Sequence, residues 1–155
     1  MIEDDIMVVT FCGHGKISYG PRVEEDLRYW LEILIEGGAN RFLLGGYGNF
    51  DLMAARVIKD LKDQFPFIRS TIVLPYLDKK YNKELYDDSI YPELENVPKR
   101  LAIIKRNEYM VDMSNAVIAY IEYDFGGAAA TLRYAYKKDK FIIKLNEQRP
   151  HEVVG

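Results

Sequence analysis

The segment Arg41–Leu61, RFLLGGYGNFDLMAARVIKDL, decides how this chain folds. Its first four residues, 41–44, form an apolar run that predicts a strand, and residues 50–61 carry apolar side chains at helical spacing. Asn49 or Asp51 can cap this helix. Between the two elements lies a glycine-rich turn formed by Gly45, Gly46 and Gly48. A strand, a glycine turn and a helix in this order favour an α/β protein with a parallel sheet.

The rest of the chain alternates strands and helices in the same way. The other predicted strands lie at residues 6–11, 70–74, 116–121 and 141–145. The other predicted helices lie at residues 21–36, 100–113 and 128–137, with a short strand at 101–104 as an alternative. We therefore expect an α/β fold: a single Rossmann-like, three-layer domain over residues 1–155, with a mostly parallel sheet of about five strands flanked by helices.

Two segments depart from this alternation. The periodicity fades over residues 76–100, which we expect to form a loop or lid that includes a short helix at KELYDD. The segment is rich in tyrosine, and a tyrosine ring can stack on a base or pack the connection down. Residues 146–155 are predicted to be a polar tail.

Composition narrows the classes of function. The net charge is −3 without a basic stripe, which argues against general binding of nucleic acid. The single cysteine, Cys12, permits no internal disulfide, and no cluster of Cys and His indicates a metal site. The N-terminus lacks the basic region of a signal peptide, and no apolar run is long enough for a membrane span. We therefore expect a cytoplasmic protein without membrane contact, metal or cofactor.

Glycine-rich segments follow three of the predicted strands, at residues 12–15, 45–48 and 126–127. Ligands of open α/β sheets bind at the carboxyl ends of the strands, so these segments should converge on one edge. A helix that begins after a glycine turn offers free N–H groups and a partial positive charge to a phosphate. The motifs are neither G-x-G-x-x-G nor a P-loop. Tight turns without a ligand are the alternative interpretation.

Polar side chains near these turns extend the candidate site. Arg106 can bind a phosphate or carboxylate with its guanidinium, with Asp112 as a partner or a cap, whereas Met110 is expected in the core. His14 can contact a phosphate or base, exchange a proton, or hydrogen-bond structurally. Thr131 can donate its hydroxyl to a phosphate. The candidate ligand-binding residues are Gly13, His14, Gly45, Gly46, Gly48, Asn49, Asp51, Tyr76, Arg106, Asn107, Gly126, Gly127, Ala128 and Thr131.

With these motifs in order, residues 7–145 resemble the SLOG superfamily of Rossmann-like nucleotide-binding proteins, especially its short standalone bacterial members. The superfamily includes the LOG phosphoribohydrolases and DNA-processing protein A. The turn at 45–53 resembles the first glycine-rich turn of LOG enzymes. Residues 106–110, RNEYM, match their Arg-Lys…Met segment with Asn107 in place of Lys. Residues 125–133, FGGAAATLR, resemble their Pro-Gly-Gly-x-Gly-Thr-x-x-Glu motif.

The resemblance breaks at the catalytic carboxylate of the LOG enzymes. The position of their glutamate falls on Arg133 or Tyr134. A carboxylate favours cleavage of the bond between base and ribose because positive charge develops on the sugar. Asp51, Glu122 or Asp124 can supply a carboxylate from another direction. The resemblance thus implies a nucleotide frame without the family's evident catalytic set.

Three functions follow from this comparison. The first is binding, by sensing or sequestering, of a nucleotide or nucleotide-derived small molecule. The second is an N-glycosidase or phosphoribohydrolase acting on a nucleoside 5′-monophosphate or related N-glycoside, with Arg106 as the one catalytic candidate. The third is an interaction domain with a vestigial pocket. The resemblance further implies a homodimer or higher homo-oligomer.

Overall fold

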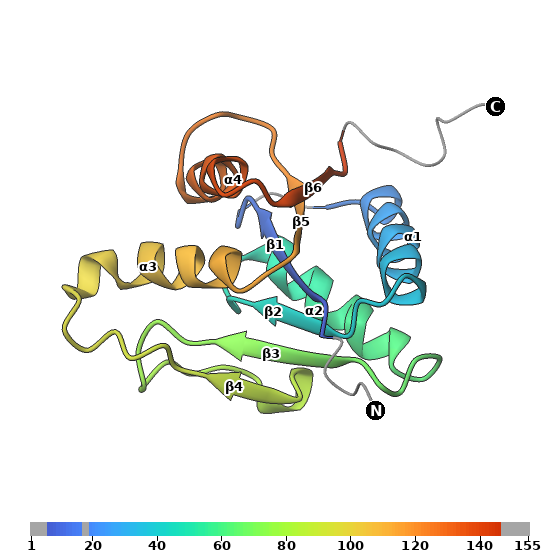
Figure 1. Cartoon of the computed structure of the whole chain (residues 1–155), viewed down its shortest axis with the longest axis horizontal. Coiled ribbons are helices and arrows are strands. Elements are labelled where there is room, and N and C mark those ends of the chain that lie inside the picture. The colour runs from blue at the N-terminus through green and yellow to red at the C-terminus, as the bar shows by residue number, and fades with distance from the viewer. Residues whose placement is uncertain (1–5, 17–18, 147–155) are drawn as a thin grey trace.

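The computed structural model describes residues 6–16 and 19–146 (Figure 1). The elements within these residues are, in order, β1 (Val8–Gly13), α1 (Pro21–Glu36), β2 (Arg41–Leu44), α2 (Asn49–Leu61), β3 (Arg69–Val73), the 3-10 helix η1 (Lys83–Leu85), β4 (Asp88–Ile90), α3 (Lys99–Asp112), β5 (Ala116–Tyr120), α4 (Gly127–Lys137) and β6 (Phe141–Lys144). The expected α/β architecture is confirmed.

All neighbouring strands of the sheet run parallel, in the order β4-β3-β2-β1-β5-β6. The chain builds outward from β1 to β4 and then returns to the other side of β1 with β5. The register places Cys12 beside Ala119 and Gly13 beside Tyr120, so β1 and β5 end together. The strand order therefore reverses between β1 and β5, where parallel sheets form their ligand crevice.

Two helices cover each face of the sheet (Figure 1). Helix α1 packs beside α2, and α3 packs beside α4. Alternate strand residues serve the two layers: Phe42 and Leu44 join the core under α1 and α2, whereas Leu43 packs with Met110 of α3. Successive residues of a strand face opposite layers, and both layers are apolar. The sequences of the central strands are therefore continuous apolar runs.

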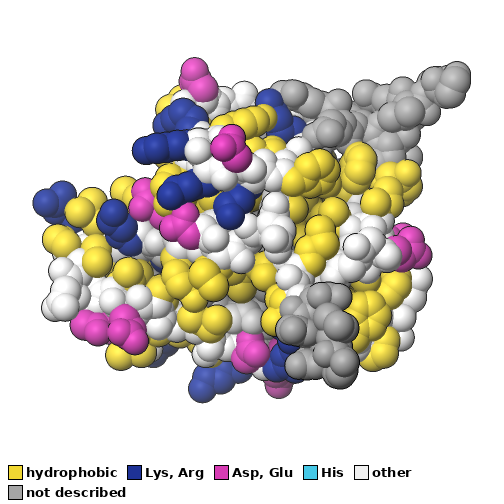
Figure 2. Space-filling model, viewed as in Figure 1, with side chains coloured by type: hydrophobic (Ala, Val, Ile, Leu, Met, Phe, Trp, Pro, Cys, Tyr) yellow, Lys and Arg dark blue, Asp and Glu magenta, His cyan; other side chains and the backbone are white. Residues whose placement is uncertain are grey.

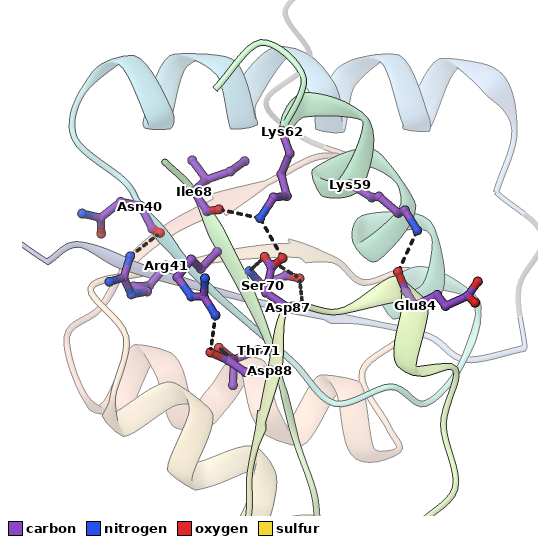
Figure 3. A network of polar contacts seen from close by, with 11 residues as sticks. Asn40, Arg41, Lys59, Lys62, Ile68, Ser70, Thr71, Glu84, Asp87 and Asp88 are labelled. Carbon is purple, nitrogen blue, oxygen red and sulfur yellow. Dashed lines mark hydrogen bonds and ion pairs between the residues drawn. The ribbon is translucent and has the colours of Figure 1, made fainter. Parts of the chain in front are cut away.

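The sheet contains one strand more than expected, because the segment 76–100 supplies β4. All three β4 residues are exposed, and the strand lies at the edge of the sheet. Polar contacts tie it down (Figure 3): Asp87 accepts the N–H of Ser70 at 2.8 Å and the Lys62 ammonium at 2.7 Å, and Asp88 pairs with Arg69 at 3.0 Å. Because polar contacts hold this edge strand, its sequence has no alternation of apolar residues from which the strand could be predicted.

Four local predictions are wrong. Helix α3 is continuous from Lys99 to Asp112, so the alternative strand at 101–104 does not form. The short helix expected at KELYDD is limited to the 3-10 turn η1. Gly48 is the N-cap of α2 and no side chain caps it, because the Asp51 carboxylate binds elsewhere. Strand β1 also lies two residues later than expected. The predicted tail beyond residue 146 lies outside the described residues.

Candidate functional site

A cavity of about 290 Å³ opens where β1 and β5 end, at the reversal of strand order. Its wall combines the end of β1, the start of α2, one side of α3 and the β5–α4 loop. The predicted site residues that line it are Gly13, His14, Asp51, Arg106, Asn107, Gly126, Gly127, Ala128 and Thr131. The tertiary structure therefore brings four separate sequence segments to one cavity.

The remaining predicted residues lie elsewhere. Gly45, Gly46 and Gly48 are not part of the cavity wall. Asn49 lines a different hollow, beside Tyr19 and Arg56. Tyr76 lines a third hollow together with Tyr91. The Lys99 ammonium lies 4.8 Å from the centre of the Tyr76 ring.

The sequence patterns did not point to three exposed aromatic side chains of the cavity wall. Tyr47, Tyr123 and Phe125 all line the cavity. Tyr47 and Phe125 expose 62% and 66% of their surface, which is unusual for large rings on a concave wall. The signal that could have found them is their position. Tyr47 lies within a glycine-rich turn, Phe125 directly precedes one, and Tyr123 lies between the end of a strand and that turn.

The first glycine-rich turn is filled by a side chain of the protein itself. Asp51 accepts the N–H of Gly45 through Oδ2 at 2.9 Å, and it also accepts the N–H groups of Gly46 and Tyr47. A carboxylate among three backbone N–H groups occupies the place that an anion would take in such a turn. The turn at 45–48 is therefore an internally satisfied corner.

The same corner explains why glycine is needed at two of its positions. A Cβ at Gly45 would lie 2.9 Å from Cζ of Arg106 and 3.0 Å from Oδ2 of Asp51. Gly48 has a φ of +92°, and a Cβ there would lie 2.5 Å from Cα of Gly15. These glycines thus serve close packing between protein segments rather than the approach of a ligand.

Arg106 braces the corner from the other side. Its side chain is 2% exposed, and Nη1 donates to the carbonyl oxygens of Gly45 at 2.8 Å and Val73 at 2.9 Å. Nε donates to Oδ1 of Asn107 at 2.9 Å. Arg106 thereby ties α3 to the ends of β2 and β3. Asp112 does not orient it, because the Asp112 carboxylate instead accepts the Tyr134 hydroxyl at 2.8 Å.

Burial and charge work against each other at this pair. Burial raises the pKa of Asp51 to about 6, although the Arg106 charge and the N–H groups of the turn favour the ionised form. Burial also lowers the pKa of Arg106, which the Asp51 charge opposes. Among the described residues that line the cavity, Asp51 is the only carboxylate.

The start of α4 differs from the start of α2. Gly126 precedes α4 with a φ of +91°, no side chain caps the helix, and its first turn contains no acidic residue. The N–H groups of a first helical turn have no acceptor within the helix. Gly126, Gly127 and Ala128 line the cavity. This end of the cavity therefore offers an open, partly positive helix terminus.

Thr131 lies one turn into α4. Its hydroxyl donates to the carbonyl oxygen of Gly127 at 2.9 Å, within its own helix. This proton is therefore already engaged, and the predicted donation to a phosphate would require the hydroxyl to turn. The Thr131 oxygen retains its capacity to accept a hydrogen bond.

A column of aromatic rings forms another part of the wall. Tyr123 stacks on His14 with ring centres 3.7 Å apart and planes 12° apart, and Phe125 stacks on Tyr123 at 4.4 Å. Nε2 of His14 accepts the backbone N–H of Glu122 at 3.0 Å and, more weakly, that of Tyr123 at 3.4 Å. Burial lowers the pKa of His14, while the Glu122 charge raises it.

The residues at the expected glutamate position bring no carboxylate to the cavity. Arg133 donates to the carbonyl oxygen of Asp124 at 3.1 Å, and Tyr134 binds Asp112. Glu122, one of the alternative acids, accepts the Tyr120 hydroxyl at 3.0 Å and is not part of the cavity wall. Of the three acids considered from the sequence, the cavity contains Asp51.

Comparison with known proteins identifies relatives and solved structures to which this chain is similar. No protein-family model matches the chain. A UPF0398 protein from Halalkalibacterium halodurans is 28% identical over 154 residues, which cover 90% of this chain and 76% of that protein. The molybdenum cofactor binding protein from Rippkaea orientalis superposes with a TM-score of 0.62 at 19% identity, over 88% of this chain and 74% of that one.

A second solved structure is DNA processing protein A from Helicobacter pylori, described in a single-stranded DNA binding mode. It superposes with a TM-score of 0.60 at 19% identity, over 88% of this chain and 63% of that one. These likenesses confirm the Rossmann-like fold that the motifs predicted, and one of them is to a DNA processing protein A, which the resemblance to the SLOG superfamily had named. Within the described residues, none of the helices is long and apolar enough to cross a membrane.

Proposed function

We propose that this protein binds a nucleotide or nucleotide-derived small molecule in the cavity at the carboxyl ends of β1 and β5. The observation that carries the proposal is the open N-terminus of α4, which faces a cavity whose wall also includes exposed aromatic rings. The helix terminus suits the phosphate, and the rings suit the base. A volume of about 290 Å³ lies at the lower end of the roughly 300–1,000 Å³ of ligand pockets, which favours a mononucleotide-sized ligand.

The two glycine-rich helix starts have different roles in this proposal. At α2 the Asp51 carboxylate occupies the turn, and a second anion there would meet a like charge. At α4 the first turn contains no acidic residue, and no side chain within the described part of the chain caps it. An anion at a helix N-terminus gains about 0.3–1 kcal/mol at an exposed site and up to about 2 kcal/mol when partly buried. We therefore place the phosphate at Gly126–Ala128.

The aromatic rings support a planar group on the ligand. Tyr47, Tyr123 and Phe125 each keep part of their ring surface exposed at the cavity. Stacking of a base on an aromatic side chain contributes about 1–3 kcal/mol and works with every base. This part of the wall therefore favours nucleotides as a class, and it does not select one base.

The direct test is to identify what the purified protein carries. The protein is denatured, the released material is analysed by mass spectrometry, and emptied protein is titrated calorimetrically with mononucleotides, ADP-ribose forms and cyclic nucleotides. The panel includes molybdenum cofactor and a single-stranded oligonucleotide, because structures of this fold bind them. A nucleotide-like ligand with micromolar or tighter affinity is expected. If no nucleotide is released and no member of the panel binds, the proposal is refuted.

The oligonucleotide is included in the panel because basic side chains gather on one part of the surface. Figure 2 shows Lys and Arg side chains gathered over α4, with acidic side chains among them. Exposed cations of this region are Arg133, Lys137 and Lys138. The net charge of −3 opposes extended binding of nucleic acid, so we expect the small ligand to bind more tightly than the oligonucleotide at physiological salt.

The presence of Asp51 in the cavity wall supports a second candidate function, the hydrolysis of an N-glycoside. It is the carboxylate of the described cavity wall, and burial raises its pKa to about 6. Its bonds to the 45–47 turn nevertheless hold it as a structural group, so we favour binding without turnover. Incubation with AMP, NAD and cyclic ADP-ribose, followed by chromatography for free base, separates the two functions. Turnover that is abolished in Asp51→Asn would establish the hydrolase.

A further inference from the structure

The His14 ring has one nitrogen committed to the protein and one facing no described partner. Nε2 accepts the backbone N–H groups of Glu122 and Tyr123, at 3.0 and 3.4 Å. A nitrogen that accepts N–H groups cannot itself carry a proton. In the neutral ring, the proton must therefore reside on Nδ1, which fixes the tautomer.

His14 is part of the cavity wall, so we consider its Nδ1–H as a donor to a bound ligand. The side chain is 4% exposed and belongs to the cavity wall, with one face of its ring stacked on Tyr123. Among the residues that the structure describes, none forms a hydrogen bond with Nδ1. Within the described residues, Nδ1 is not among the enclosed side-chain atoms that lack a partner, so its N–H stays open to water or to a ligand.

We propose that His14 is a specificity-determining residue whose Nδ1–H donates a hydrogen bond to an oxygen acceptor of the bound ligand. This inference rests on the proposed function and adds a second polar anchor to the α4 terminus. The donor is uncharged, so it recognises a phosphate oxygen, a sugar oxygen or a ring carbonyl by geometry rather than by net charge. It rejects a ligand that presents an amino group at the same position, because two donors then face each other.

Three contacts hold the His14 residue in place. The backbone bonds to Nε2 set the direction of the ring, the Tyr123 stack sets its plane, and the Tyr19 hydroxyl donates to the carbonyl oxygen of His14 at 2.8 Å. A donor held in this way loses little conformational entropy when a ligand arrives. Protonation of the ring would break both bonds to Nε2, which agrees with the lowered pKa of this histidine.

The tautomer is tested first, without any ligand. The chain has two histidines, so His151→Gln leaves His14 as the only imidazole in the spectrum. Two-bond ¹H–¹⁵N correlation of ¹⁵N-histidine-labelled protein at neutral pH distinguishes a protonated Nδ1 from a protonated Nε2. We expect the Nδ1–H form. A protonated Nε2 overturns the inference, whatever the ligand.

The ligand contact is tested with histidine methylated on Nδ1, incorporated at position 14. This change removes the donor and keeps the Nε2 acceptor and the ring stack. The backbone N–H shifts of Glu122 and Tyr123 verify that the scaffold is unchanged. Calorimetric titration with GMP, AMP and inorganic phosphate should show affinity reduced roughly three- to tenfold, as for loss of one hydrogen bond. His14→Phe, which keeps only the stack, should show at least the same loss.

The pattern over the three probes identifies the acceptor. Weaker binding of all three indicates a phosphate oxygen, loss with both nucleotides but not with phosphate indicates the sugar, and loss with GMP alone indicates the ring carbonyl. Wild-type protein that binds the nucleotides while the methylated variant binds them equally well overturns the role of His14 and leaves the proposed function intact. If the wild-type protein binds another member of the panel instead, that ligand replaces the three probes. Wild-type protein that binds no member of the panel overturns the proposed function and this ligand role together.

Discussion

Asp51 and Arg106 hold the two polar groups of the same residue, Gly45, from opposite sides. Oδ2 of Asp51 accepts the Gly45 N–H at 2.9 Å, and Nη1 of Arg106 donates to the Gly45 carbonyl oxygen at 2.8 Å. The two side chains come from α2 and α3, on opposite faces of the sheet. The glycine turn is thus the point where both helical layers are joined through polar contacts.

Replacing Gly45 with alanine should destabilise the protein. The added Cβ would lie 2.9 Å from Cζ of Arg106, so the braced corner has to shift, and overpacking of this kind costs about 1–3 kcal/mol. Denaturant unfolding measures the loss. Gly127→Ala is the matched control, because a Cβ there meets nothing within 4 Å. Equal stability of the two variants would contradict the role of the corner.

Asp51 should make stability depend on pH in the acidic range. Its folded-state pKa is raised to about 6 from 3.8, so the folded protein holds this proton more tightly than the unfolded chain. The stabilising effect of protonation is present at low pH and is lost as the pH rises towards 6, by roughly 1–3 kcal/mol.

The measurement is the difference in free energy of unfolding between wild type and Asp51→Asn from pH 4 to pH 8. Because Asn does not titrate, the stability of the wild type relative to the variant should fall as the pH rises to about 6 and then level off. A relative stability that rises over this interval would mean that the folded-state pKa of Asp51 is lowered.

A carboxylate at the start of α4 should weaken ligand binding without harming the fold. Ala128→Asp places a negative charge where we place the phosphate, and the loss should be about 1–2 kcal/mol, or roughly tenfold in Kd. The same charge is favourable for the helix itself, so Tm should not fall. Ala130→Asp, on the same helix but outside the cavity wall, controls for charge alone. Identical affinities of the two variants would exclude this phosphate position.

Removal of the Phe125 ring should affect binding far more than stability. Phe125 is 66% exposed, so Phe125→Ala should change the free energy of unfolding by less than about 0.5 kcal/mol. Loss of a stacking surface should weaken nucleotide binding by about 1–3 kcal/mol, which titration calorimetry resolves. Phe67→Ala, at a ring that is 57% exposed and distant from the cavity wall, should bind as the wild type does.

A self-associating face would be expected where apolar side chains remain uncovered. Val8, Leu43, Ile90, Tyr109 and Met113 line a hollow of about 310 Å³ beside α3, and Figure 2 shows hydrophobic side chains in this region. Met113 exposes 54% of its surface. If the protein is a homo-oligomer through this face, Met113→Lys should reduce the mass measured by light scattering. An oligomer unaffected by this change uses another surface.

Local signals in the sequence were sufficient for most of the fold. Pro21 and Gly37 bound α1, and the apolar stripe of α2 from Phe50 to Leu61 is buried as its period predicts. These features depend on neighbours within a few residues, so the chain alone specifies them. Strand β4 escaped prediction because its stabilising contacts, such as Asp87 with Lys62, join residues that are 25 positions apart.

For the candidate site, too, some features could be predicted from the sequence and others depend on the tertiary structure. The sequence placed glycine turns after β1, β2 and β5, and parallel topology alone was enough to predict their common edge. Only the tertiary structure decided which turn is open. The carboxylate of Asp51 reaches back to the N–H groups that precede it, whereas no side chain of the described residues caps the helix that follows Gly126. Whether a backbone N–H is free for a ligand depends on side-chain positions in three dimensions, and no residue pattern specifies them.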